Sequence, residues 1–178
     1  VGAALRYARH LKAAGKPKEA LEILDTAEEA GAANAALGTT QGLLSLQQGN
    51  ARKAQQLLAK ASPETTRDWR VPSGLGVALA TLGRQADAQK HLKRALELSP
   101  GNPIVLNNLA MSHILDRKVD QAEALLKTAK GTGTQRPHVA QNLTLAMALK
   151  GQPEGLAEAE MPRLAPQKTA ASDVVPAQ

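Results

Sequence analysis

The chain has 178 residues, a formal net charge of +6 and 43% apolar residues, enough for one domain with a hydrophobic core. It contains no cysteine, which excludes disulfides, zinc–thiolate sites and thiol nucleophiles. Only Tyr7 and Trp69 are aromatic, and no apolar run approaches the roughly 20 residues of a membrane-spanning helix. The core must therefore be built from aliphatic side chains and alanine.

A period of 34 residues runs through the chain. Alanine recurs at this spacing in two series, leucine in a third, and glycine in a fourth that only Arg117 interrupts. This length is typical of a helix–turn–helix unit that stacks on its neighbours into a solenoid. The sequence therefore predicts an all-α fold with an elongated surface rather than a catalytic cavity. The series are Ala20, Ala54, Ala88 and Ala122; Ala27, Ala61, Ala95 and Ala129; Leu24, Leu58, Leu92 and Leu126; and Gly15, Gly49, Gly83 and Gly151.

Each repeat is predicted to hold two helices separated by glycine, asparagine or proline. Pro17 lies where the first turn of a helix tolerates proline, and Gly31 follows the end of that helix. Asn50 is a candidate N-cap, and Pro72 fits only the first turn of the helix that follows the irregular segment 62–72. In chain order, the predicted helix-bearing segments are 2–15, 16–31, 36–49, 50–62, 73–83, 85–103, 104–118, 119–130 and 137–150.

The repeat pattern changes at the C-terminal end. After Gly151 helical character continues, but Leu156 replaces the expected alanine and Glu160 the expected leucine, as in a terminal cap. We therefore predict about four full repeats and a C-terminal capping helix pair within a solenoid domain spanning 1–161. Residues 162–178 are rich in proline, alanine and polar side chains, and we predict that they form a disordered tail.

The pattern of small and large residues in the third repeat closely resembles the tetratricopeptide repeat. The resemblance extends over roughly residues 2–160 and implies a right-handed α–α superhelix, with the first helix of each pair on the concave wall. The second repeat departs from the family by lacking a proline at its end, and the fourth by having Arg117 in place of glycine. The residues that carry the resemblance are Leu75, Gly76, Leu79, Gly83, Ala88, Leu92, Ala95 and Pro100.

A narrower resemblance lies in segments 107–112, 122–126, 141–146 and 149–151, which read NNLAMS, AEALL, QNLTLA and LKG. They are similar to the TadD family, tetratricopeptide lipoproteins of bacterial Flp (tight adherence) pilus assembly. This implies an exported lipoprotein on the periplasmic face of the outer membrane, assisting the secretin of the pilus machine. The lipidated cysteine would precede Val1, where we also expect any targeting segment. Otherwise a cytoplasmic location is expected.

The residues expected to bind a partner lie on the first helix of each pair, turned away from the core. Asn108 and Asn142 are one repeat apart, so their amides could pair with the backbone of an extended peptide. The alternative is that these amides tie adjacent helices together. Leu43 belongs to the same wall in an earlier repeat. The predicted partner-binding residues are Arg70, Val77, Asn107, Asn108, Met111, Ile114, Gln141, Asn142 and Leu145.

The sequence argues against catalysis. The four histidines lie far apart, no carboxylate has metal-ligand spacing to them, and no nucleophile–base arrangement or phosphate-binding loop occurs. We expect a protein–protein interaction scaffold that is not an enzyme and holds no cofactor or metal. We favour a monomer over self-assembly through the cap or Trp69, which we expect to wedge between helix layers. Nucleic-acid binding is disfavoured because stacking aromatic residues are missing.

Overall fold

A computed structural model describes residues 1–61, 66–133 and 136–150. Every regular element in these ranges is an α-helix, as the sequence predicts. The predicted capping segment after Gly151 and the predicted tail at 162–178 lie outside the described residues. The helices are α1 (Gly2–Ala13), α2 (Pro17–Glu29), α3 (Ala35–Gln47), α4 (Ala51–Lys60), α5 (Arg70–Thr81), α6 (Gln85–Leu98), α7 (Pro103–Leu115), α8 (Val119–Gly131) and α9 (Pro137–Lys150).

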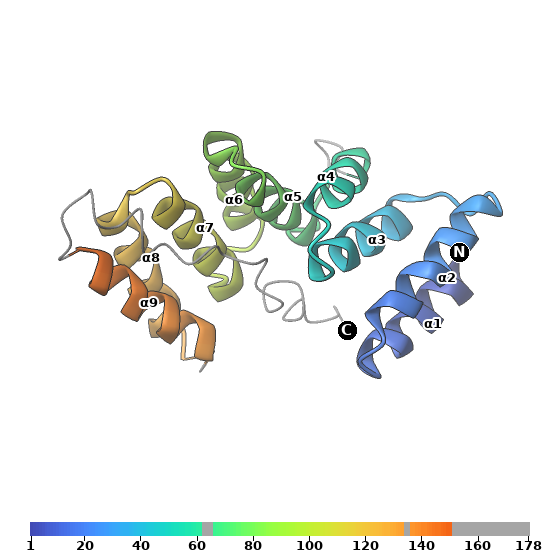
Figure 1. Ribbon diagram of the computed structural model, residues 1–178, viewed down its shortest axis with the longest axis horizontal. Helices are drawn as coiled ribbons and strands as arrows, with labels where there is room; N and C mark the ends of the chain where they lie inside the picture. Colours follow the sequence, from blue (N-terminus) through green and yellow to red (C-terminus); the bar gives the residue numbers. More distant parts are fainter. Residues whose placement is uncertain (62–65, 134–135, 151–178) are drawn as a thin grey trace.

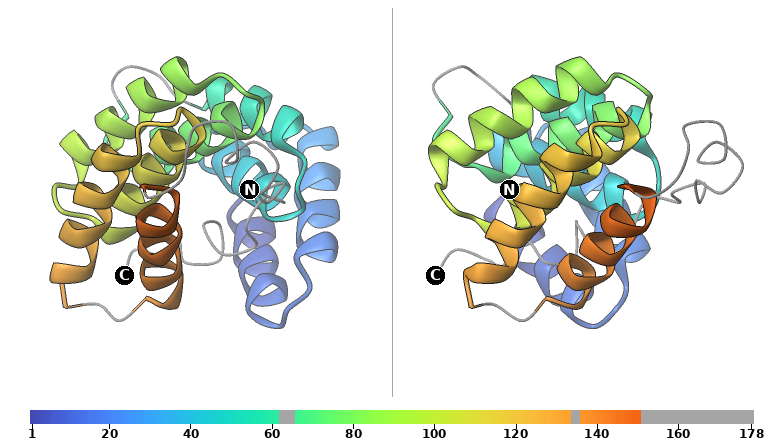
Figure 2. Two further views of the ribbon diagram at one scale, coloured as in Figure 1. Left: turned by 60° about the vertical axis from the view of Figure 1, so that its left-hand side comes forward. Right: turned by 90° about the vertical axis from the view of Figure 1, so that its left-hand side faces the viewer.

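The helices form a solenoid in which each helix packs on the next along the chain. Figure 1 shows them following one another in chain order along an arch, from α1 at one end to α9 at the other. In addition, α3, α5, α7 and α9 contact one another in succession, so one row of helices continues along the arch. The left view of Figure 2 shows α1 and α9 on the inner side of the arch, with α2 and α8 outside them. The predicted α–α superhelix is therefore confirmed.

The 34-residue series form the core. The alanine at the start of each second helix and the leucine one turn later are fully buried, because the two helices of a pair meet there. The other alanine series is buried from Ala61 onward, whereas Ala27 packs at the edge of its cluster. Small and large residues thus alternate along every second helix, and the same packing is built four times.

Glycine replaces a side chain where the first helix of a pair approaches the second most closely. A Cβ at Gly42 would lie 2.6 Å from Cγ of Leu58, and a Cβ at Gly76 would lie 2.6 Å from Cγ of Leu92. The two glycines are 34 residues apart, as are the two leucines, so the same contact recurs in successive repeats. Because such distances are too short for carbon atoms, a side chain at Gly42 or Gly76 would require the two helices to shift.

Arg117 occupies a backbone conformation that the other repeats assign to glycine. Its φ is 56°, while Gly15, Gly49 and Gly83 at the equivalent positions have φ of 76°, 80° and 80°. The left-handed region costs a residue with a Cβ roughly 1–2 kcal/mol, whereas glycine enters it freely. The interrupted glycine series therefore preserves the turn geometry at a cost in strain.

We expect Arg117→Gly to raise the free energy of unfolding by about 0.5–1 kcal/mol, because relief of strain exceeds the added entropy of the unfolded chain. Arg117→Ala is the control, since it removes the same side chain and keeps the strained backbone. Denaturant unfolding measures both. A glycine variant no more stable than the alanine variant would contradict the prediction.

Trp69 precedes α5 and packs against the cluster of Leu92, Ala95, Val105 and Leu109 between α6 and α7. The prediction that it wedges between helix layers is therefore confirmed. None of the described helices is long and apolar enough to cross a membrane.

Candidate partner-binding surface

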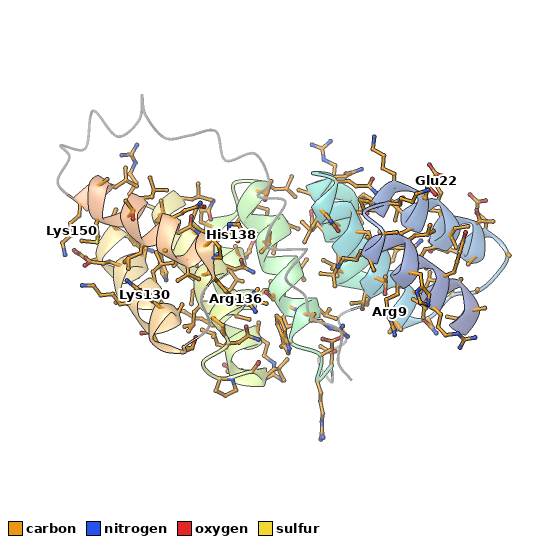
Figure 3. All side chains as sticks on the ribbon, turned by 90° about the horizontal axis from the view of Figure 1, so that it is seen from below. Arg9, Glu22, Lys130, Arg136, His138 and Lys150 are labelled. Atoms are coloured by element: carbon orange, nitrogen blue, oxygen red, sulfur yellow. The ribbon has the colours of Figure 1, made fainter. Side chains whose placement is uncertain are left out.

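Four partly exposed apolar side chains stand at equivalent positions on successive first helices. They are Leu43 on α3, Val77 on α5, Met111 on α7 and Leu145 on α9, each 34 residues after the last. We call this set the apolar row. The equivalent residue on α1 is the exposed Arg9, which Figure 3 labels on that helix. The row is therefore aliphatic over four helices and cationic at its N-terminal end.

Each side chain of the apolar row packs against a cluster of the hydrophobic core. Leu43 and Val77 pack against the cluster that contains Leu46, Leu58 and Leu79. Met111 and Leu145 pack against the equivalent cluster around α7, α8 and α9. Each side chain is fixed on one side and open on the other, so its contact surface needs little ordering when a partner binds. These contacts hold the four side chains in place whether or not a partner is bound.

The predicted amides are buried and hydrogen-bonded to side chains of neighbouring helices rather than presented to a partner. Asn142 donates from Nδ2 to Oδ1 of Asn107 over 2.8 Å, and Asn108 donates to Oγ of Ser73 over 3.3 Å. All four residues are buried. Both bonds join successive first helices, α7 to α9 and α5 to α7. The amides tie adjacent helices together, so a free amide ladder along the groove is wrong.

Ile114 is also placed differently from the prediction. It is 1% exposed and belongs to the core cluster with Ala122, Leu126 and Val139. It lies three residues after Met111, and its side chain is packed among residues of α8 and α9. It cannot contact a partner without unfolding this end of the solenoid. Of the other predicted residues, Gln141 is exposed, while Val77, Met111 and Leu145 form the row.

Arg70 is held by a bidentate ion pair at the start of α5. Its Nη2 lies 2.6 Å from Oδ2 of Asp68, and its Nε donates to the same carboxylate. Burial alone would raise the pKa of Asp68, but hydrogen bonds from the side chain and backbone of Arg70 outweigh it and lower the pKa. Arg70 is therefore first a structural residue, and a partner must compete with Asp68 for it.

A second cation lies within electrostatic range of Arg70. The pKa of Lys12 on α1 is lowered, first by burial and then by the positive charge of Arg70. Proximity of Lys12 and Arg70 adds to the charge of Arg9 near the N-terminal part of the row.

We expect Asn142→Ala to lower the free energy of unfolding by about 1–3 kcal/mol, because Oδ1 of buried Asn107 then loses its donor. Asn107→Leu combined with Asn142→Leu should cost less than the single change, since no polar atom of the pair remains buried without a partner. Chemical unfolding of the three proteins measures both effects. An alanine variant as stable as the parent would show that this bond contributes nothing.

The metal prediction can be examined only in part. Among the described residues, no group of three His, Asp or Glu side chains is arranged to hold a metal ion. His113 is buried near the end of α7, and burial, followed by the charges of Lys118 and Lys93, lowers its pKa. It belongs to the packing of α7 rather than to a polar cleft.

The apolar row is visible in the sequence as a series with a 34-residue period, but the asparagine series has the same period. Asn108 and Asn142 keep the 34-residue period as well as Met111 and Leu145 do, so periodicity alone does not say which series faces outward. Val77 and Leu43 extend only the apolar series, because the positions equivalent to Asn108 hold glycine at 74 and threonine at 40. Continuity over four repeats is the feature that distinguishes the row.

Known proteins give the same architecture. The solved structure of TTC0263, a thermophilic TPR protein in Thermus thermophilus, has a TM-score of 0.72 at 21% identity, covering 84% of this chain and 82% of that chain. The structure of Pseudomonas aeruginosa pilF has a TM-score of 0.67 at 24% identity over 83% and 66%. MamA of AMB-1 has a TM-score of 0.61 at 27% identity over 72% and 75%. No curated protein sequence matches this chain.

Two family models match the sequence, both described as tetratricopeptide repeat. One matches residues 39–103 and the other residues 79–146, so the two matches overlap and together run from α3 into α9. The 34-residue period, the paired helices and the recurring glycine–leucine contact agree with this assignment. The chain belongs to the tetratricopeptide repeat family.

Proposed function

We propose that this protein is a non-enzymatic scaffold that binds a segment of a partner protein along the apolar row. The observation that carries the proposal is the continuity of Leu43, Val77, Met111 and Leu145, partly exposed on four successive helices. Isolated apolar residues on a surface are ordinary, but an aligned row on a concave wall is a feature of binding surfaces.

The spacing of the row restricts the partner. Neighbouring helices pack about 8–10 Å apart. An extended chain covers this distance in about three residues, and a helix in about six or seven. The partner segment should therefore present apolar side chains at one of these intervals. A folded surface without such a period would contact only one or two side chains of the apolar row.

The apolar contact alone is too weak for a stable complex. Covering the open half of four aliphatic side chains contributes roughly 3–6 kcal/mol. Association itself costs at least about 4 kcal/mol in lost translational and rotational freedom. Further contacts must supply the difference, and the exposed Arg9 at the α1 end of the row is placed to provide one. We infer that the partner segment carries carboxylates at the end that lies near α1.

The resemblance to the TadD family supports a more specific role. We propose that the chain acts in the assembly of an Flp-type pilus or related secretion machine, at the periplasmic face of the outer membrane and beside the secretin. The similarity of the fold to Pseudomonas aeruginosa pilF is compatible with this role, although at 24% identity it concerns the fold. The binding function does not depend on this location.

Deletion of the gene in its source organism tests the pilus role. We expect the deletion strain to lose surface pili and the secretin multimer, and the full precursor to restore both. Cell fractionation should place the precursor with the outer membrane, and radiolabelled palmitate should label it. Normal piliation in the deletion strain would refute the pilus role. The scaffold function would then still stand and would be tested by binding to the partner protein.

A further inference from the structure

The junction between α2 and α3 differs from the later junctions between helix pairs. At the later junctions, α4 packs on α5, α6 on α7 and α8 on α9, and the first helices of successive pairs also pack on one another. The contact of α2 with α3 is less extensive, and α1 makes no comparable contact with α3 among the described residues. In Figure 1, the α1–α2 pair lies at the right-hand end of the arch and a loop joins it to α3.

A polar residue lies at the centre of the α2–α3 junction. In α3 it is Gln41, which is 0% exposed. Leu37 and Leu44 lie on either side of it and pack against the cluster of α1 and α2, so the pair stays attached to α3. At the three later junctions the position of Gln41 holds a buried leucine, namely Leu75, Leu109 and Leu143.

Charged side chains of α2 and α4 bind Gln41 and one another. Nε2 of Gln41 donates to Oδ1 of Asp25 over 2.8 Å and to Oε2 of Glu28 over 2.9 Å. Nζ of Lys53 on α4 lies 2.8 Å from Oδ2 of the same Asp25. These bonds link the first pair of helices to both helices of the second pair. We call Asp25, Glu28, Gln41 and Lys53 the polar latch.

The polar latch opens more easily than a leucine contact. Oε1 of Gln41 is buried and accepts no hydrogen bond from the described residues, so opening the junction hydrates an unsatisfied acceptor. Asp25 and Lys53 are 36% and 37% exposed, so water and salt weaken their attraction. Separating a leucine from its neighbours instead exposes apolar surface to water. The α2–α3 junction therefore resists rotation less than the later ones.

The side-chain tie between first helices is also missing at this junction. The bonds between α5 and α7 and between α7 and α9 have Leu5 and Thr40 as their equivalent pair on α1 and α3. Leucine cannot form such a bond, and Thr40 donates to the carbonyl oxygen of Ala36 in its own helix. The pair of α3 and α5 lacks this tie too, but those two helices pack directly on one another.

The loop that joins α2 to α3 has the composition of a hinge. Residues 30–34 read AGAAN, and only the third of them is even partly buried. Gly31 has a φ of 84°, a conformation that glycine enters without strain. Hinges are short loops whose residues take up the change in backbone angles when packed units move.

We propose that the α1–α2 pair turns as a unit about the loop 30–34, and that the polar latch holds it in the closed position. The turn changes the distance between Arg9 on α1 and Leu43 on α3, the first step of the apolar row. A partner segment that contacts both would favour one position of the hinge. That consequence rests on the proposed function, whereas the hinge rests on the contacts of α2, α3 and α4.

Distances between two spin labels measure the hinge without any partner. The chain has no cysteine, so two introduced cysteines carry the only labels. Glu22→Cys with Lys90→Cys spans the α2–α3 junction; Gln56→Cys with Ala124→Cys has the same separation of two 34-residue periods and does not span it. All four side chains are exposed. In pulsed electron paramagnetic resonance, the first distance distribution should be wider than the second by about twofold or more.

Two variants should change this width in opposite directions. Asp25→Ala removes the carboxylate that Gln41 and Lys53 both bind, so the distribution across the junction should broaden further. Asp25→Ala combined with Gln41→Leu gives this junction the residue types of Ala59 and Leu75 at the next one, and the width should fall to about that of the control pair. The control distribution should stay the same in both variants, which verifies that the rest of the solenoid is folded.

Two results would overturn the proposal. Equal widths for the two label pairs in the otherwise unchanged chain would exclude the hinge. A wide distribution across the junction that neither variant alters would exclude the polar latch as the element that holds it. Failure of the proposed function is a separate result, because loss of partner binding leaves these distances in the free chain unchanged.

Discussion

Replacing Gly76 by alanine is expected to lower the free energy of unfolding by about 1–3 kcal/mol, the cost of overpacking a filled core. The new Cβ would lie 2.6 Å from Cγ of Leu92 and 3.0 Å from the backbone carbonyl oxygen of Ala88. Leu92 is fully buried and cannot turn away, and the carbonyl belongs to α6, which packs on both α5 and α7. The two helices must therefore separate. For a chain of this size, each kcal/mol lowers the Tm by about 2–4 °C.

Gly38→Ala is the matched control for this substitution. Gly38 lies within α3, and an added Cβ would be 3.7 Å from Cβ of Ala61, an ordinary contact. Alanine should therefore stabilise the helix there by about 0.5–1 kcal/mol. Thermal unfolding followed by circular dichroism should show shifts of opposite sign for the two variants. A Tm of Gly76→Ala at or above that of the parent would disprove the close-packing argument.

Charging the apolar row is expected to abolish partner binding. The double variant Val77→Asp with Met111→Asp removes the apolar contact at two neighbouring positions of the row. The two new carboxylates must also lose their hydrating water when a partner segment covers them. We expect affinity to fall by about 100-fold or more, equivalent to about 3 kcal/mol. Under the proposed pilus role, the amount of secretin recovered with the tagged chain after crosslinking in cells measures the effect, and pilus number in the complemented deletion strain reports its consequence.

The controls add negative charge away from the four apolar side chains, one charge in each control against two in the double variant. Gln56 is exposed on α4 and Gln141 is exposed on α9 beside the row, so aspartate at each position separates distance from charge. Gln56→Asp should bind as the parent does, and Gln141→Asp should have an intermediate effect. Equal recovery of the secretin with the double variant and with Gln56→Asp would rule out the row as the binding surface.

Much of the scaffold follows from the sequence because its constraint is volume. At the crossing of two helices, Ala88 and Leu92 are both fully buried, and only a small residue and a large one in this order fit. The 34-residue period records that constraint directly. The turn at Arg117 is fixed by backbone conformation in a similar way. Its left-handed φ preserves the geometry that glycine adopts in other repeats.

The exposure of the candidate residues was predicted in part. Val77, Met111 and Leu145 are partly exposed, as expected, and so is Leu43, which completes the row. The amides and Ile114 were misplaced because they lie at the border between the outward and the buried faces of their helices. Successive residues on a helix differ in direction by about 100°, so a small rotation decides whether such a side chain points outward or into a neighbour.

The sequence by itself determined the repeat, the order of the helices and the residues of the core, because each is a local or periodic requirement of packing. Only the tertiary structure decided the partners of the polar side chains. Asn142 pairs with Asn107, and Asn108 with Ser73, across 35 residues rather than 34. Partner choice depends on how neighbouring helices cross, and a single helix does not encode that angle.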